Sequence, residues 1–177
     1  MSYVTAITDR VLSDVTTPTS KGLFNVADWT RVYGNAKITT ELTEVMLETP
    51  ITFNAVTSPT TSTALVSLYT MFNTLLANIE RLRLAVAGES IPGTSTEIVD
   101  DWTPGPNEDS PDYTDVNLWE STVDAIWDYW GGGDLDVDMV LAEDLIIPTA
   151  TQLIVVDSID TAGYNIDIQG TGKLYII

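Results

Sequence analysis

The spacing of apolar residues changes at the triple glycine Gly131–Gly133, and this change limits the folds open to the chain. Before it, apolar residues recur every three or four positions, the period of an α-helix. From Asp134 onwards they alternate with polar residues, the period of a β-strand. Short alternating runs separated by Pro and Gly predict four or five strands in 134–177. We therefore expect an α+β chain: an N-terminal helical module, either a helix hairpin or a coiled-coil-like bundle, followed by a small all-β module completed by oligomerisation.

Two helices are expected in the first part of the chain. Residues 3–15 place apolar side chains at helical spacing and predict a short amphipathic helix or arm. Asn25 is suited to cap a second helix, with Asp28 in the capping-box position, and this helix should run to Leu47. The stretch 49–63 is rich in Pro, Thr and Ser, and it predicts an extended, solvated linker.

The longest helix is expected over 64–87, where apolar residues follow a heptad. Alternating steps of three and four residues place them along one seam of the helix. Such a seam packs either in the core of a bundle within one chain or against other copies in a parallel coiled coil, and the spacing leaves both open. The seam residues are Leu65, Leu68, Phe72, Leu75, Ile79, Leu82 and Val86.

A Trp-rich helix is expected after a turn-rich stretch. Residues 91–112 contain several Pro and Gly and predict a linker, which separates a helical docking module, 1–90, from a Trp-rich segment, 113–133. We expect Thr114 to cap this helix. Its apolar side chains share one face, which favours burial in a core or a subunit interface. They are Val116, Trp119, Val123, Ile126, Trp127 and Trp130.

The chain has no cysteine and no histidine, and its formal net charge is −19. Catalysis by Cys–His or Ser–His–Asp groups is therefore excluded, and any metal site is limited to oxygen ligands. No Lys or Arg occurs between Arg83 and Lys173, so binding to nucleic acid or to an anionic membrane surface is disfavoured. No apolar run reaches the roughly 20 residues that cross a bilayer, and the N-terminus lacks the pattern of a secretion signal. We expect synthesis in the cytoplasm.

Acidic residues are numerous but do not form a recognisable site. Asp134, Asp136 and Asp138 alternate as in a calcium loop, yet Met139 stands where the EF-hand turn requires Gly and Leu145 where it requires Glu. Adjacent acidic residues, which a glycosidase would need across a sugar bond, arise by chance in so acidic a chain. We therefore expect no enzymatic activity, no metal site and no cofactor.

One charged and aromatic pattern occurs twice, in KGLFNVADWTRVYGN and in PDYTDVNLWE, where an aromatic or Asn/Asp residue opens a helix that carries Trp beside a charge. With Ile7–Arg10 (ITDR) ahead of it, the first copy resembles minor structural proteins of tailed bacteriophages. The second copy resembles a later helix of the same proteins. The resemblance covers about the first fifth of the chain and residues 102–120. It departs from the family pattern at Trp29, Thr30 and Leu118, where Leu, Asn and Arg are commoner.

The resemblance implies a structural protein of a phage virion, whose helical part docks to a tail, baseplate or other virion protein. Arg10 and Arg31 match family positions and are the expected docking contacts, together with Asn25, Asp28 and Trp29. The heptad, the Trp face, the few strands and an apolar C-terminal end all favour assembly with other copies, most simply as a homotrimer.

Two other functions fit the same sequence. A capsid decoration or head-fibre protein would be equally acidic, oligomeric and non-catalytic. A carbohydrate-binding module would use Trp102, Trp119, Trp127 and Trp130 as stacking surfaces, which requires their indoles to be exposed. The short strands are similar to the opening rungs of β-helical or β-prism stalks in phage fibres and adhesins, and this similarity favours the fibre-type interpretation.

Overall fold

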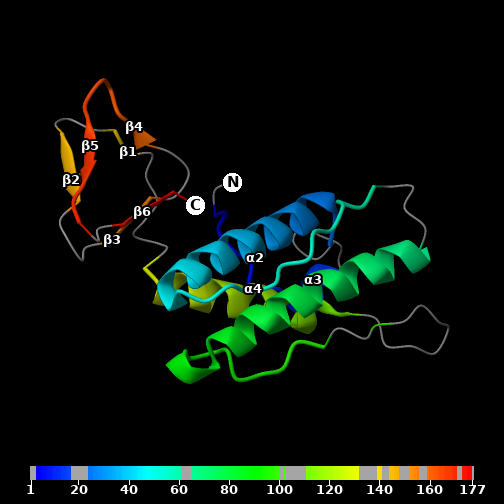
Figure 1. Ribbon diagram of the computed structural model, residues 1–177. Coiled ribbons are helices and arrows are strands. Elements are labelled where there is room, and N and C mark those ends of the chain that lie inside the picture. Colours follow the sequence, from blue (N-terminus) through cyan, green and yellow to red (C-terminus); the bar gives the residue numbers. More distant parts are fainter. Residues whose placement is uncertain are drawn as a thin grey trace. The chain divides into compact units, whose positions relative to one another are not determined.

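A computed structural model describes residues 3–16, 24–60, 65–99, 102, 111–131, 139–140, 144–147, 152–155, 159–170 and 173–176. The chain divides into two units, Tyr3–Trp130 and Gly131–Ile177, which we call the helical unit and the β unit (Figure 1). A mostly helical chain with small β-sheets near its C-terminus agrees with the expected α+β class. The sequence led us to expect boundaries both in the 91–112 stretch and at the triple glycine, and the division falls at the second of these.

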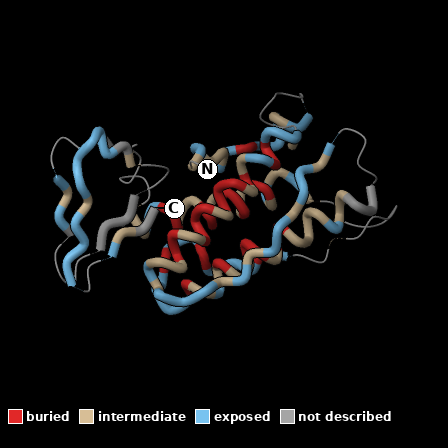
Figure 2. Tube along the Cα trace, turned by 45° about the horizontal axis from the view of Figure 1, so that its top comes forward, coloured by how far each residue is buried: buried red, intermediate tan, exposed pale blue. Residues whose placement is uncertain are grey.

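Three long helices form the helical unit: α2 (Val26–Leu47), α3 (Leu65–Ala85) and α4 (Tyr113–Tyr129). Each packs against the other two, and buried stretches run along all three (Figure 2). A short helix α1 (Leu12–Thr16) and the 3-10 turn η1 (Ala87–Glu89) are the other helical elements in the described part. The apolar core residues include Trp29, Val32, Leu75, Leu76, Ile79, Ile98, Trp119 and Val123.

Helix α2 begins and ends as the sequence predicts. Asn25 Oδ1 accepts hydrogen bonds from the backbone N–H groups of Ala27 (2.8 Å) and Asp28 (3.4 Å). In return, Asp28 Oδ2 accepts the N–H of Asn25 at 3.0 Å. This capping box pairs backbone donors that the first turn of a helix leaves unpaired. The helix ends at Leu47, where Glu48 takes a left-handed conformation with φ 49°.

The heptad residues of α3 lie in the core of the same chain. Leu75, Ile79 and Leu82 are fully buried, and Phe72 packs edge-on against Trp29 with ring centroids 5.1 Å apart. Leu68 is half-buried at the margin of the core. The bundle interpretation is therefore confirmed for the described part of the seam. A coiled coil between copies stays a prediction.

The expected linker after α2 is packed against the core. Residues 49–60 form no helix or strand, as predicted, but Phe53 and Val56 are half-buried against the core. The Asn78 side chain binds the backbone of Asn54 twice: Oδ1 accepts its N–H and Nδ2 donates to its carbonyl, both at 2.8 Å. The Pro-, Thr- and Ser-rich composition wrongly predicted a solvated linker, because the apolar contacts of Phe53 and Val56 and the amide of Asn78 hold this segment against the core.

The expected linker after α3 is also part of the core over the residues described. Within 91–99, Ile91 and Ile98 are buried. The Glu80 carboxylate accepts the N–H of Ile98 at 2.9 Å and forms an ion pair with Arg83 on the same helix. Over 91–99, the turn-rich sequence therefore forms a folded connection packed against the helices.

Helix α4 starts two residues earlier than expected. Asp112, not Thr114, is its N-cap: Oδ1 accepts the N–H groups of Thr114 (2.6 Å) and Asp115 (3.3 Å), and Asp115 Oδ2 accepts the N–H of Asp112 (2.8 Å). The predicted apolar face is confirmed. Its buried members are Val116, Trp119, Val123, Ile126 and Trp127, and Trp130 is half-buried.

In the described part of the β unit, six short strands form three parallel pairs, where the sequence predicted four or five strands without assigning their partners. The pairs are β1 (Met139–Val140) with β4 (Ile159–Asp160), β2 (Leu145–Ile147) with β5 (Ile166–Ile168), and β3 (Gln152–Val155) with β6 (Lys173–Ile176). Partner residues lie 20 or 21 positions apart, as Met139 with Ile159 and Leu145 with Ile166. Every side chain described in 144–146, 159–170 and 173–174 is exposed or half-buried (Figure 2).

Candidate functional site

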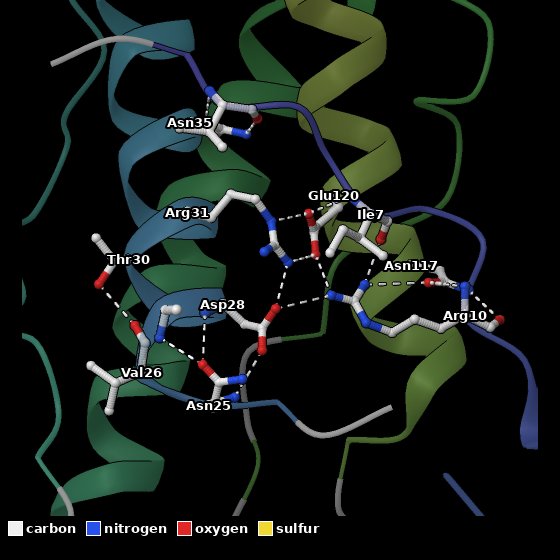
Figure 3. A network of polar contacts seen from close by, with 12 residues as sticks. Ile7, Arg10, Asn25, Val26, Asp28, Thr30, Arg31, Asn35, Asn117 and Glu120 are labelled. Carbon is white, nitrogen blue, oxygen red and sulfur yellow. Dashed lines mark hydrogen bonds and ion pairs between the residues drawn. The ribbon is translucent and has the colours of Figure 1, made fainter. Parts of the chain in front are cut away.

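Two arginines and two carboxylates from three parts of the helical unit meet in one charge network (Figure 3). Arg10 Nη2 lies 2.8 Å from Glu120 Oε1 and 3.5 Å from Asp28 Oδ1. Arg31 binds Glu120 through Nε (3.0 Å) and Nη2 (2.9 Å), and Asp28 through Nη2 (2.7 Å). The two positive and two negative groups balance one another. We call these four residues the charge network.

The charge network is almost closed to solvent. The side chains of Arg10, Asp28 and Glu120 are 2%, 5% and 1% exposed, and that of Arg31 is 12% exposed. Burial acts to lower the pKa of Arg31, but its hydrogen bonds to Glu120 and Asp28 outweigh burial and raise that pKa above its usual value. A buried ion pair adds little stability by itself, whereas loss of one partner leaves a costly unpaired charge. The fold therefore needs all four charged groups present, because removal of any one leaves a buried charge without its partner.

Residues 3–10, which we call the arm, form no helix or strand, so the helix predicted over 3–15 is limited to α1. Two asparagines hold the arm by its backbone. Asn35 accepts the N–H of Val4 (2.9 Å) and donates to its carbonyl (2.6 Å). Asn117 accepts the N–H of Arg10 (3.2 Å) and donates to its carbonyl (2.9 Å). Amide side chains thus replace the neighbouring strand or helical turn that would otherwise pair these backbone groups.

The beginning of the arm is fixed by Tyr3. Its ring stacks on Trp127, with centroids 4.5 Å apart and an angle of 7° between the planes. Its hydroxyl donates to Asp124 at 2.8 Å. Burial raises the pKa of Tyr3, and the hydrogen bond to Asp124 raises it further, so the phenol stays protonated as the donor. The N–H of Ile7 donates to Glu120 at 2.8 Å and joins the arm to the charge network.

The charge network corrects the docking role expected for Arg10 and Arg31. Buried guanidinium groups already bound by carboxylates of the same chain are not displayed to a partner. The other expected docking residues also act internally, because Asn25 and Asp28 cap α2 and Trp29 is fully buried.

One sequence signal for the network was available but unused. Glu120 lies on the buried face of α4, directly after Trp119, and a carboxylate on such a face requires a partner. Asp28, beside the buried Trp29 on α2, gives the same signal.

An apolar pocket lies beside the first turns of α3 and α4. Its volume is about 190 Å³, and five of its lining residues are aromatic: Phe24, Tyr69, Phe72, Trp102 and Trp119. Leu68, Pro111 and Val116 complete the lining, so no lining residue carries a charge. The Phe72 ring centroid lies 5.4 Å from that of Phe24 and 6.0 Å from that of Trp119. We call this the aromatic pocket.

The tryptophans do not form the exposed surface that sugar stacking requires. Trp119 and Trp127 are only 2% and 3% exposed. Trp130 is half-buried and donates its indole N–H to Thr43 Oγ1 at 3.1 Å. Trp102 is half-buried and donates to the carbonyl of Val99 at 3.2 Å. Trp119 and Trp127 are therefore too deeply buried to stack on a sugar. Trp102 and Trp130 are half-buried and do not complete the predicted four-residue platform without them.

Within the part of the chain that the structure describes, no group of three or more Asp or Glu side chains is placed to hold a metal ion. Asp134, Asp136 and Asp138, the calcium-like pattern of the sequence, lie outside that part. Among the described helices, none is long and apolar enough to cross a membrane.

Comparisons of the chain with protein-family models, with curated proteins and with solved structures find no match. The resemblance to phage structural proteins therefore stays a prediction from the motifs in the sequence.

Proposed function

We propose that the chain is a non-enzymatic structural protein of a tailed-phage virion, of the tail or baseplate adaptor or fibre type. In this proposal the helical unit docks to another virion protein, and the β unit is the part presented by the assembled particle. No cofactor takes part. The proposal joins the sequence resemblance to the division of the chain into a closed helical unit and a repetitive β unit.

The repeat in the β unit is the observation that carries this proposal. Strands β1, β2 and β3 pair in parallel, and in the same order, with β4, β5 and β6, which follow them by 20 or 21 residues. That is the strand order of two successive coils of a parallel β-solenoid. Solenoid coils gain stability by stacking on further coils or on other copies. A stalk or fibre is built by such stacking.

We also propose that the chain assembles as a homotrimer. Only the β unit supports association between copies. The heptad of α3 from Phe72 onwards and the Trp face of α4 are packed within one chain, so neither requires a second copy. In the described part of the β unit, each strand pairs with one other strand and no side chain is buried. Sheets of two strands are marginal by themselves, and association through this unit would extend them.

Location in the virion can be tested on the parent particles with gold-labelled antibodies raised against the purified chain, viewed by electron microscopy. We expect label at the tail end. Label over the head would support the capsid decoration or head-fibre alternative instead. Serum absorbed beforehand with the purified chain is the control and should leave the particles bare. Particles that stay bare with unabsorbed serum, while the chain is detected in host lysate, would contradict a virion protein of either kind.

A further inference from the structure

The aromatic pocket has no role in the charge network, in holding the arm or in the β unit. Its walls come from separate parts of the helical unit: Phe24 precedes α2, Phe72 belongs to α3, Trp102 follows the 91–99 segment, and Trp119 belongs to α4. The pocket opens at the margin of the core: Val116 and Trp119 are buried, and the other lining residues are half-buried. Apolar pockets of this kind, rimmed by polar residues, mark interaction sites more often than purely structural regions.

The size and lining of the pocket indicate the chemistry of its ligand. An apolar cavity of roughly 150 Å³ is enough to hold benzene, so this pocket has room for one aromatic ring or one large aliphatic side chain. Phe24 and Trp119 are both tilted by 49° against Phe72, so the pocket offers ring edges and faces in more than one direction. Aromatic anchors seated in such pockets supply much of the binding energy in protein interfaces.

The charged residues beside the pocket indicate which charge the partner residues next to the inserted side chain carry. Pro111, in the lining, is followed by the exposed Asp112 and by Asp115 on the first turn of α4. Among the described residues 111–115, these two carry the only charges, and both are negative, in a chain whose formal net charge is −19. A basic segment is therefore attracted to this end of α4, and an acidic one is repelled.

We propose that the aromatic pocket is a docking site for a basic segment of a partner protein, which inserts one aromatic or large aliphatic side chain into the space that Phe72, Trp102 and Trp119 line. The inserted side chain supplies the affinity, and the flanking Lys or Arg side chains face the acidic start of α4. This inference does not depend on where the protein resides, because it concerns an interaction that the purified chain alone can show.

The test uses the full chain and three blocked, fluorescein-labelled peptides, with binding followed by fluorescence anisotropy. The probes are KGWGK, its anchor-deleted form KGAGK and its charge-reversed form EGWGE. We expect KGWGK to bind at least tenfold more tightly than either of the others, since each lacks one half of the recognition. Equal binding of KGWGK and KGAGK would overturn the proposal, because it would show attraction by charge without use of the pocket. Equal binding of KGWGK and EGWGE would overturn the basic character of the partner.

Two variants on α3 test whether the peptide binds in the aromatic pocket. Leu68→Trp adds bulk to the pocket lining and should weaken binding of KGWGK at least tenfold. Leu84→Trp makes the same change on α3 at an exposed site (56%) outside this pocket and should leave binding unchanged. Circular dichroism checks that both variants are folded. Should Leu68→Trp fail to fold, free indole serves in its place: it should displace KGWGK from the unmodified chain, and failure to displace would overturn the proposal.

Discussion

The helical unit and the β unit are held together in different ways. In the helical unit, polar side chains far apart in sequence complete one another, as Arg10 does with Glu120 over 110 positions and Tyr3 with Asp124 over 121. In the β unit, the pairs are backbone ladders between strands 20 or 21 residues apart. Its described side chains are exposed or half-buried. The first arrangement closes a fold on itself, whereas the second can be continued by adding a further coil or a further copy.

This difference predicts where the chain tolerates change. A closed network of buried charges has no substitute for a missing member, because water does not reach the group left behind. Exposed polar groups beside a strand recover their hydrogen bonds from solvent. The same chemical substitution should therefore be costly in the helical unit and nearly neutral in the β unit.

The largest effect is expected from Glu120→Ala. It leaves Arg10 and Arg31 with Asp28 as the remaining carboxylate of the charge network, and it removes the acceptor of the Ile7 N–H. We expect a loss of about 3–5 kcal/mol in the free energy of unfolding, the usual cost of breaking a buried ion pair. Urea unfolding followed by circular dichroism at 222 nm measures it.

Glu41→Ala is the matched control for that variant. Glu41 pairs with Lys37 on the surface of α2, where both side chains are more than 40% exposed. Its removal should change stability by less than about 1 kcal/mol. Similar losses in the two variants would show that the charge network contributes no more than a surface pair.

A smaller effect is expected when one asparagine is removed from each unit. Asn78→Ala leaves the N–H and carbonyl of Asn54 without their partner and should cost about 1–3 kcal/mol. Asn165→Ala removes an exposed side chain whose hydrogen bond to Asp144 is 3.4 Å long, and it should change stability by less than about 0.5 kcal/mol. Thermal unfolding of the two variants in parallel compares them. Equal shifts in Tm would contradict the expected difference in tolerance between the helical unit and the β unit.

The smallest effect is expected from pH. Burial acts to raise the pKa of Glu80, but hydrogen bonds from Arg83 and from the backbone of Ile98 outweigh it and lower that pKa below its usual 4.5. Because the folded state prefers ionised Glu80, its stabilising contribution is complete above pH 4.5 and is lost as the pH falls below that value. Glu80→Gln removes this contribution. The difference in Tm between the two proteins should therefore be largest near pH 7 and shrink on acidification, and a difference that grows in acid would contradict the assigned pKa direction.

Local patterns in the sequence predict local structure well in this chain. Asn25 and Asp28 form the expected capping box because the residues that bond are three positions apart. The apolar faces of α3 and α4 are buried as their spacing indicates, because helical period alone brings those residues together. The missed cap of α4 follows the same local rule, since Asp112 precedes Asp115 by three positions.

The candidate sites could not be predicted in the same way. Arg10 meets Glu120 only because the arm crosses α2 and α4, and no local pattern encodes that path. Arg10 appears as an ordinary charge in an acidic sequence, which is why it was expected at the surface. The position of Glu120 on the apolar face of α4 signals that it has a partner, but not which residue that partner is. The aromatic pocket was equally hidden, because Phe24, Phe72 and Trp102 come from three segments that only the completed fold brings together.

The position of the arm at the start of the chain has a consequence for synthesis. Residues 3–10 leave the ribosome well before their partners Asn117, Glu120 and Trp127, which are made more than 100 residues later. At usual elongation rates of about 5–20 residues per second, the arm waits roughly 5 to 20 seconds before its binding surface exists. During that interval α2 is complete but Asp28 and Arg31 lack Glu120. The helical unit therefore cannot fold step by step along the nascent chain, and its closure should be a late event governed by release of α4.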